Sequence, residues 1–231
     1  MNNTITIIVP VYGRSELLKD ALRSIEIQNN ESLRLIIADD GSDNITKTFI
    51  SEWIRRNKEI ETIWIKREKN IGLFKNLNEA ITTNYSPWYL LLCSDDILAP
   101  NAIEKIKDTI NNWEECDLII STYESIGPSK EILPNVDSWH HDRMSKTTKQ
   151  FKEGKLNKYL LQLGSINGNL TGMLFSRQCW VKTGQFKEEW THAADWEWML
   201  RAVDTNIVLL NREMIAMVRT HEKQLSNTNR R

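Results

Sequence analysis

The chain has 231 residues, of which 40% are hydrophobic, so it is long enough to bury one substantial core. Its 30 basic and 31 acidic residues give a formal net charge of −1. This balance lacks the strongly basic footprint of proteins that bind nucleic acid phosphates, and leaves room only for a local basic patch.

No segment has the features of a secretion leader or a membrane span. The chain passes from Met1-Asn2-Asn3 into an apolar run with no positively charged leader, and no stretch approaches the roughly 20 apolar residues that a bilayer span requires. The cysteines, Cys93, Cys116 and Cys179, are odd in number and widely spaced, which favours free thiols in a reducing compartment. We therefore expect a cytoplasmic protein.

Short apolar runs alternate with amphipathic segments along the first half of the chain. The pattern predicts strands at residues 4–11, 33–38, 61–66, 88–92 and 117–121, and helices at 15–28, 45–56, 73–82 and about 100–113. This rhythm is typical of a parallel sheet with right-handed crossovers, and the continuous apolar runs fit strands that are covered on both faces. The expected fold class is α/β.

The pattern changes in the second half. Residues 125–155 are rich in Pro, Gly, Ser, His and charged residues, which is typical of a long insertion or loop that is functional or mobile. Regular structure is expected again at 155–163 and 169–175. A helix at 193–203 and two closing strands, at 207–210 and 214–218, complete the prediction.

Polar and charged residues follow each of the first four predicted strands. The four segments are Tyr12-Gly13-Arg14, Asp39-Asp40-Gly41-Ser42, Glu68-Lys69-Asn70-Ile71-Gly72 and Ser94-Asp95-Asp96. In an open parallel sheet they emerge at one edge, where such folds bind their ligands. Paired carboxylates at one edge repel one another unless a cation or hydrogen-bond donors offset their charge. The arrangement predicts a site for a divalent metal and a polar ligand.

Each of the two Asp pairs, taken alone, could be a turn that caps the following helix. Two such pairs, one after the second and one after the fourth predicted strand, are harder to account for by turn formation, which favours the ligand site. The sequence contains no G-x-G-x-x-G dinucleotide motif, no phosphate-binding P-loop and no G-x-S-x-G nucleophile motif. These absences disfavour the ligands and the chemistry that those motifs serve.

Six segments together resemble family 2 glycosyltransferases of the GT-A fold. They are IIVPVYGR (7–14), ADDGS (38–42), NIGLFKNLNEAI (70–81), CSDDILAP (93–100), ADWEWMLR (194–201) and VRTHEKQLS (218–226). They occur in the family's order and span nearly the whole chain. The resemblance implies a GT-A-like three-layer α/β sandwich, with a mainly parallel central sheet flanked by helices. It also implies a single domain over 1–231, in which about 1–98 bind the nucleotide sugar and about 99–231 the acceptor.

The resemblance assigns roles in donor binding to five residues. Tyr12, with the backbone around Pro10, would stack on the nucleotide base, and Asp40 would accept a hydrogen bond from a ring N–H. This pattern suits uracil, so a UDP-sugar is favoured over TDP and GDP sugars. Asp95 would hold the ribose, and Asp96 would bind Mn²⁺ or Mg²⁺. A hard cation with oxygen ligands stabilises the negative charge of the departing diphosphate.

The resemblance also implies the catalytic base. Asp195 would take a proton from an acceptor hydroxyl while that oxygen attacks the anomeric carbon, and one displacement inverts the configuration. A helix cap is the alternative role for Asp195. His221 would reach the metal or the diphosphate, against the alternative of a structural histidine. Glu197 and Arg201, spaced i, i+4, are expected to form an ion pair outside the chemistry.

Three positions depart from the family pattern. Gly13 stands where Asn is usual, Leu77 where Arg is usual, and Cys93 where Asp is often present. The base or phosphate contact of that Arg is therefore in doubt here, with Lys75 as an alternative source.

Tryptophans and histidines supply the candidate acceptor side. Trp190, Trp196 and Trp198 flank Asp195 and could form a sugar platform, although core packing is expected for at least one of them. The segment His140-His141-Asp142 is interpreted as part of an acceptor-side loop.

The expected function is inverting transfer of a hexose or related sugar from a nucleotide sugar to a glycan or lipid-linked saccharide, in polysaccharide assembly. No nucleic acid partner is expected, and peripheral association with the inner face of the cell membrane stays open. The alternatives are a catalytically inactive nucleotide-sugar-binding module and a sugar-nucleotide pyrophosphorylase. The latter chemistry needs a glycine-rich basic loop, whereas residues 9–14 contain one glycine.

Overall fold

A computed structural model describes residues 4–28, 32–134, 144–163, 170–190 and 193–221. Its strands are β1 (Ile5–Val11), β2 (Leu33–Asp39), β3 (Glu61–Lys66), β4 (Trp88–Leu91), β5 (Ile97–Leu98), β6 (Leu118–Ile126), β7 (Lys149–Phe151), β8 (Met173–Ser176) and β9 (Val208–Arg219). Its helices are α1 (Ser15–Glu26), α2 (Asn44–Arg56), α3 (Leu73–Thr83), α4 (Ala102–Asn112), α6 (Asn157–Leu163), α7 (Arg177–Thr183) and α8 (Ala194–Thr205).

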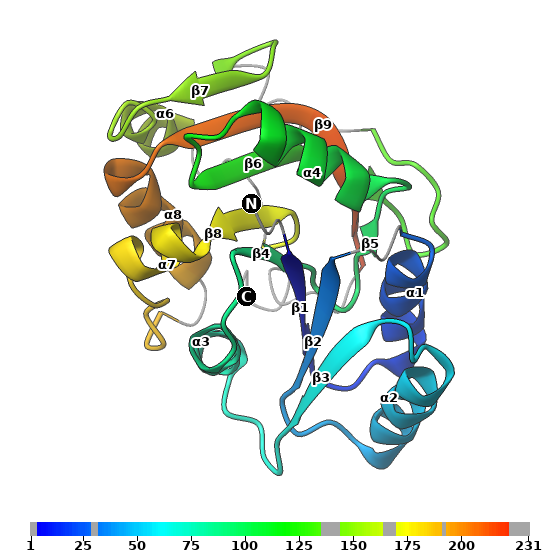
Figure 1. Ribbon diagram of the computed structural model, residues 1–231. Helices are drawn as coiled ribbons and strands as arrows, with labels where there is room; N and C mark the ends of the chain where they lie inside the picture. The colour runs from blue at the N-terminus through cyan, green and yellow to red at the C-terminus, as the bar shows by residue number, and fades with distance from the viewer. Residues whose placement is uncertain (1–3, 29–31, 135–143, 164–169, 191–192, 222–231) are drawn as a thin grey trace.

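The strands form one central sheet in the order β3-β2-β1-β4-β8-β6-β9-β5, and β7 also pairs with β9 (Figure 1). Strands β1 to β4 pair in parallel. Strand β8 runs antiparallel to both β4 and β6, and β9 is parallel to β6. Among the described strands, β5, β7 and β8 therefore point one way and the other six point the opposite way. The expected α/β class with a mainly parallel sheet is confirmed.

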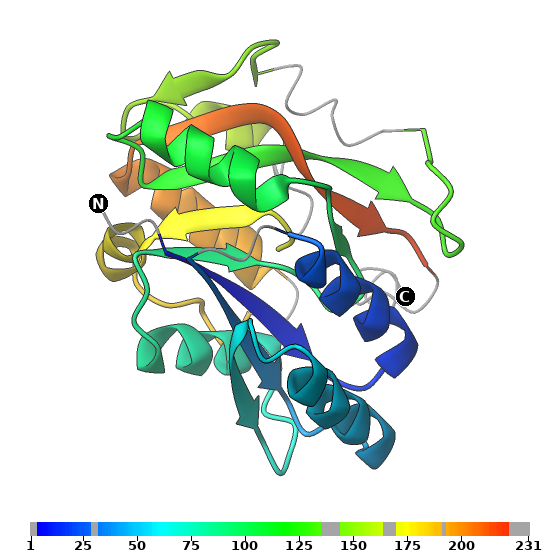
Figure 2. The same cartoon turned by 45° about the vertical axis from the view of Figure 1, so that its right-hand side comes forward.

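Helices cover both faces of the sheet and produce three layers (Figures 1 and 2). Helices α1, α2 and α4 pack on one face, and α3, α6, α7 and α8 pack on the other. In β1, Ile5 and Ile7 join the first core cluster, whereas Ile8 joins the second. This division follows from the alternation of side chains along a strand. It explains why the first strands read as continuous apolar runs.

The observed elements agree with most predictions in the first half of the chain. The strand at residues 61–66 has the predicted bounds, and the other early strands and helices differ by a few residues at their ends. The two-residue β5 and the short elements β7 and α7 were not predicted. Such short segments carry too few residues to show a period.

The two predicted closing strands are wrong, because residues 208–219 form the single strand β9. The polar residues at 211–213 suggested an interruption. They stay within the strand, because a register shift against β6 at Ser121 to Tyr123 lets β9 carry extra residues opposite a shorter stretch of its partner.

The predicted loop at 125–155 is wrong at both ends. Strand β6 continues to Ile126, which also forms a bridge with Ile132, and β7 occupies residues 149–151. The segment His140-His141-Asp142 lies outside the described residues, so its acceptor-side interpretation stays a prediction.

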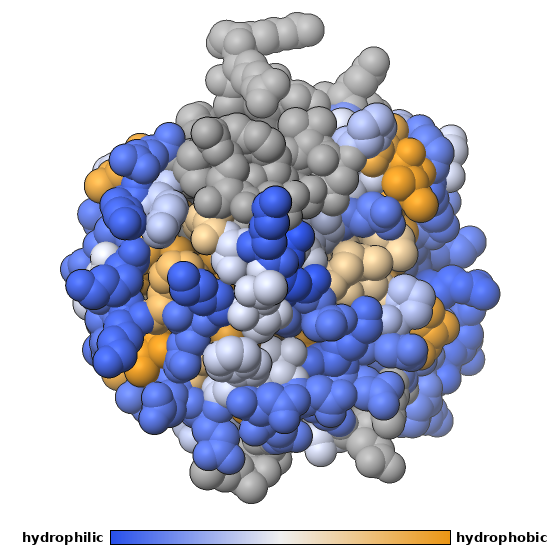
Figure 3. All heavy atoms as spheres, turned by 90° about the horizontal axis from the view of Figure 1, so that it is seen from above, coloured by the Kyte–Doolittle hydropathy of each residue, from blue (hydrophilic) through white to orange (hydrophobic). Residues whose placement is uncertain are grey.

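The helices of the described residues are short and amphipathic. None of them has both the length and the apolar character needed to cross a bilayer. The described part of the face in Figure 3 is largely hydrophilic, with apolar residues in separate patches.

An aromatic cluster fixes α8 against the sheet. The rings of Phe175, Trp180, Phe186 and Trp198 lie with centroids 5.1–6.1 Å apart in five pairs. Asn78 of α3 anchors this cluster: its amide donates to the carbonyl of Phe186 at 2.9 Å and accepts from the backbone N–H of Phe186 at 2.9 Å. Helix α3 is thereby joined to the segment that precedes α8.

Replacement of Asn78 tests this connection. Asn78→Ala leaves both backbone groups of Phe186 without their partner, and we expect a loss of about 1–3 kcal/mol in the free energy of unfolding. Urea denaturation measures it. Asn112→Ala, at an exposed position in α4, is the matched control and should leave stability nearly unchanged. Equal stability of the two variants would contradict this role of Asn78.

Candidate functional site

The loops that follow β1 to β4 meet at one edge of the sheet, as the sequence predicted, and hydrogen bonds join neighbouring loops. The backbone N–H of Gly13 donates to Ser42 Oγ at 2.9 Å, which joins the loops after β1 and β2. Asp40 accepts from the N–H groups of Ile71 and Gly72 at 2.8 and 3.0 Å, which joins the loops after β2 and β3. The ends of β1, β2 and β3 therefore form one connected rim.

Gly41 lets two of these loops approach each other closely. Its φ is +78°, and a Cβ at this position would lie 2.7 Å from the carbonyl carbon of Lys69. A side chain there would combine backbone strain with a clash against backbone atoms. The glycine of the Asp-Asp-Gly-Ser segment therefore keeps Asp40 within reach of the loop after β3.

The predicted base-binding residues lie on this rim. Tyr12 is 62% exposed directly after β1, so its ring is accessible to a flat ligand, and Pro10 is buried within the strand. Asp40 is also buried, with its carboxylate oriented by the two N–H groups. A carboxylate offers about four acceptor positions, so Asp40 retains the capacity to accept from a ligand.

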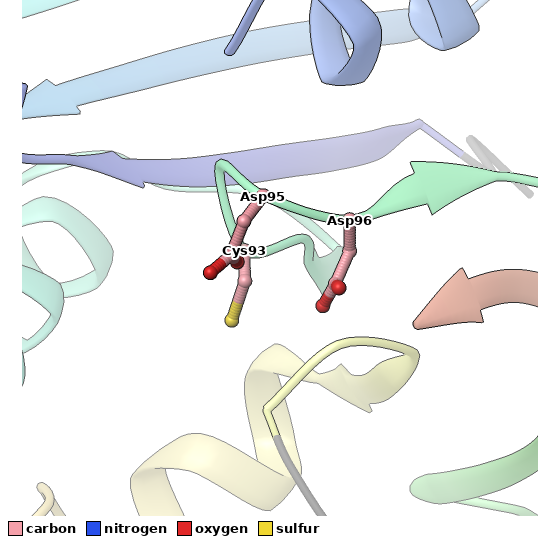
Figure 4. Close-up of side chains that lie close together, drawn as sticks. All are labelled: Cys93, Asp95 and Asp96. Carbon is pink, nitrogen blue, oxygen red and sulfur yellow. The ribbon is translucent and has the colours of Figure 1, made fainter. Parts of the chain in front are cut away.

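A cluster of metal-ligand side chains lies between β4 and β5 (Figure 4). Cys93, Asp95 and Asp96 point to the same side of the loop, and one ligand atom from each lies within 4.8 Å of the others. His221 Nε2 lies 3.1 Å from Asp95 Oδ2, so this histidine, which is distant in sequence, lies beside the cluster. Arg14 Nη1 lies 3.5 Å from the same oxygen.

Asp96 is the most deeply buried carboxylate of the cluster, at 3% exposure. Oδ1 accepts from the backbone N–H of Arg219 at 2.8 Å, and Oδ2 accepts from the hydroxyl of Thr171. Burial, and then the negative charge of Asp95, raise the pKa of Asp96 to about 7. Both effects favour the protonated form of Asp96 over the form that an ordinary aspartate takes.

Asp195 lies in the first turn of α8, close enough to the cluster to affect it. Burial, together with Asp96, Asp95 and Asp195, raises the pKa of the Cys93 thiol well above its usual value. Burial also raises the pKa of Asp195 itself. Its Oδ1 accepts from the N–H of Trp196 at 2.9 Å, a contact of the capping type.

The predicted ion pair on α8 is confirmed. Arg201 makes two contacts with the Glu197 carboxylate, at 2.7 and 2.9 Å, and Lys187 Nζ lies 2.9 Å from it. Arg201 also donates to the carbonyl oxygens of Thr183 and Gln185. The pair thus ties α8 to the end of α7, and it plays a structural part in holding the helix that carries Asp195.

The three tryptophans have different environments. Trp198 is buried in the aromatic core and donates to the carbonyl of Gly184 at 2.8 Å, so the expectation that at least one is a core residue is confirmed. Trp196 is half-buried. Trp190 is 43% exposed, with Lys187 Nζ 5.3 Å from its ring centroid. Its accessible ring leaves it as the candidate for contact with a sugar.

Two residues of this site were missed as functional candidates. Arg219 is 1% exposed and donates to the carbonyls of Asp95 and Pro128 and to the Asp20 carboxylate, each at 2.9 Å. Thr171 contacts Asp96 from the approach to β8. Arg219 stands in the same segment as His221, which was a usable signal. Nothing in the local sequence distinguishes Thr171 from other threonines.

Known proteins give the context for this geometry. The sequence model of glycosyl transferase family 2 matches residues 6–172. An uncharacterized glycosyltransferase of Rickettsia typhi is 24% identical over 227 residues, which cover 97% of this chain and 66% of the relative. The teichoic acid poly(glycerol phosphate) polymerase of Staphylococcus epidermidis is 33% identical over 113 residues, which cover 48% of this chain and 15% of that protein.

Solved structures share the fold. S. aureus TarS 1–349 in complex with UDP-GlcNAc has a TM-score of 0.76 at 17% identity, with 97% of this chain and 61% of that chain covered. A Pyrobaculum calidifontis mannosyltransferase in complex with GDP-Man and Mn²⁺ has a TM-score of 0.69 at 12% identity, with 95% and 58% covered. The expected GT-A-like fold is confirmed. The chain spans about two thirds or less of the length of these proteins.

The buried state of Asp96 predicts a dependence of stability on pH. Its folded-state pKa of about 7 exceeds the ordinary value of 3.8, so folding favours the protonated form. Without added metal, the wild type should lose stability relative to Asp96→Asn as the pH rises from about 4 to about 8. Urea denaturation of both proteins across this range measures the difference. A constant difference would show that Asp96 does not titrate in this window.

Proposed function

The chain belongs to glycosyl transferase family 2, and from this we propose that it transfers a sugar from a nucleotide-sugar donor, with a UDP-sugar favoured, to a hydroxyl of a glycan or lipid-linked saccharide. Inversion of the anomeric configuration is part of the proposal. The observation that carries it is the convergence of Asp95, Asp96 and His221 at the rim formed by the strand ends, with Asp195 near by.

The residues of the cluster fit a divalent cation. Carboxylate oxygens and an imidazole nitrogen are ligands that suit Mn²⁺, and carboxylate oxygens suit Mg²⁺. The two adjacent carboxylates also repel each other when both are charged, so a cation would relieve the cost that burial imposes on Asp96. Asp96 and His221 would hold the cation, whose chemistry is to stabilise the charge that develops on the diphosphate. Mn²⁺ in the Pyrobaculum calidifontis complex supports this choice.

Donor recognition is assigned to the residues of the neighbouring loops. The exposed ring of Tyr12, together with the backbone around Pro10, would stack on the base, and Asp40 would accept from a ring N–H. Asp95 would contact the ribose. Complexes of TarS with UDP and UDP-GlcNAc support a uridine nucleotide, whereas GDP-Man in the second structure supports a guanosine nucleotide. The accepting carboxylate at Asp40 suits the uracil N3–H.

Asp195 is proposed as the base. As the acceptor oxygen forms its bond to the anomeric carbon, the bond from that carbon to the diphosphate oxygen breaks, and the hydroxyl proton passes to Asp195. The raised pKa of Asp195 makes it a stronger base than an ordinary aspartate. Residues 1–98 would thus bind the donor, and residues 99–231 would supply the base and the acceptor surface, including Trp190.

The proposed metal can be tested by removing it and by replacing Asp96. EDTA should abolish transfer and Mn²⁺ should restore it. Asp96→Asn should weaken UDP binding in the presence of Mn²⁺ by tenfold or more, on the order of 1.4 kcal/mol, and leave metal-free UDP binding nearly unchanged. Titration calorimetry with and without Mn²⁺ measures the two UDP affinities separately. Asp108→Asn, at an exposed position on α4, is the matched control. Transfer at full rate in EDTA would contradict the proposed metal.

The proposed base can be tested by replacing Asp195. Asp195→Asn keeps the shape of the side chain and removes its basicity, so kcat should fall by about 10²–10⁴. Binding of UDP and Mn²⁺ should stay unchanged. The donor is first chosen from a panel of nucleotide sugars, and rates are then measured with Asp204→Asn, on the same helix, as the control. NMR of the product should show the inverted anomer. A retained anomer, or wild-type kcat, would exclude Asp195 as the base.

A further inference from the structure

Thr171 brings a buried hydroxyl to the centre of the site. Because β8 runs antiparallel to β4, the start of β8 lies at the edge where β4 ends. The N–H of Gly172 donates to the carbonyl of Leu91 at 3.0 Å, which holds this segment against the end of β4. Thr171 is 0% exposed. The segment that carries Thr171 is therefore held against the end of β4.

The hydrogen bonds of Thr171 determine where its proton points. Its Oγ1 accepts from the backbone N–H of Cys93 at 2.9 Å and donates to Oδ2 of Asp96. The hydroxyl accepts the Cys93 N–H through a lone pair of its oxygen. Its single proton is then available to donate to the Asp96 carboxylate. The other oxygen of Asp96 accepts from the N–H of Arg219 at 2.8 Å. The two contacts, one on each oxygen, fix the plane of the carboxylate.

A buried hydroxyl at this position calls for an explanation. Valine has nearly the same shape as threonine and carries no polar group, so packing alone would favour it. The hydroxyl instead joins two groups of the loop between β4 and β5, the backbone N–H of Cys93 and the carboxylate of Asp96, which is adjacent to Asp95. Its hydrogen bonds within this loop therefore account for the presence of the hydroxyl.

We propose that Thr171 is a positioning residue, whose hydroxyl holds Asp96 in the orientation that receives a divalent cation together with the nucleotide diphosphate. This inference rests on the proposed function. Partners that orient metal-binding carboxylates typically change metal affinity by about 10–100-fold when they are removed. Thr171 comes from the second half of the chain, so that half contributes to the donor site as well as to the acceptor side.

The test compares two substitutions. Thr171→Val removes the hydroxyl and keeps the volume, whereas Thr171→Ser keeps the hydroxyl and removes a methyl group. Titration calorimetry with Mn²⁺ on the UDP-saturated protein should show affinity about 10–100-fold weaker for Thr171→Val, and within a few-fold of the wild type for Thr171→Ser. Metal-free UDP affinity should be the same in all three proteins. Thr171→Ala provides a second hydroxyl-free variant if Thr171→Val does not fold.

The outcomes separate this inference from the proposed function. Wild-type Mn²⁺ affinity in Thr171→Val, with a loss in Asp96→Asn, would overturn the role of Thr171 and leave the metal site standing. An equal loss in Thr171→Val and Thr171→Ser would also overturn it, because the hydroxyl would not be the cause. Absence of Mn²⁺ binding in the wild type would overturn the metal site and this inference together.

Discussion

The burial of negative charge at the carboxyl edge of the sheet is the constraint on which the site depends. Asp95 and Asp96 are adjacent, and Asp96 is almost fully withdrawn from solvent. Burial and like charge both disfavour the ionised form, so the pair exists only because nearby donors offset part of the cost. The donors, the Thr171 hydroxyl and the Arg219 backbone N–H, come from distant parts of the chain.

Arg219 shows how that placement is achieved. Strand β9 is parallel to β6 and ends at the carboxyl edge, which brings a buried guanidinium between the Asp95 carbonyl, the Asp20 carboxylate and the Pro128 carbonyl. One residue thereby links α1, the loop after β6 and the acidic loop. His221 follows two residues later, so the strand that stabilises the cluster also delivers its imidazole.

A separate set of contacts holds the helix of the proposed base. Trp198 anchors α8 in the aromatic core, and Glu197 and Arg201 tie it to the end of α7. Asp195 lies in the first turn of α8 together with Glu197, so a rigid element carries its carboxylate. The proposed donor site lies on strand ends and the proposed base lies on a packed helix, and rigid elements of this kind favour the fixed geometry that the proposed single displacement requires.

The sequence by itself determined the first four strands and their helices, the α/β class, and the gathering of Tyr12, Asp40, Asp95 and Asp96 at one edge. Each rests on local information: apolar period, turn residues, and the rule that parallel strands end at a common edge. The ion pair on α8 was predictable from its i, i+4 spacing for the same reason. Only the tertiary structure decided that β8 inserts between β4 and β6, that residues 208–219 form one bulged strand, and that Thr171 and Arg219 meet Asp96. Those last contacts join residues 75 and 123 positions apart. Which distant residues meet depends on which surfaces are buried together, and a local hydrophobic period does not predict that.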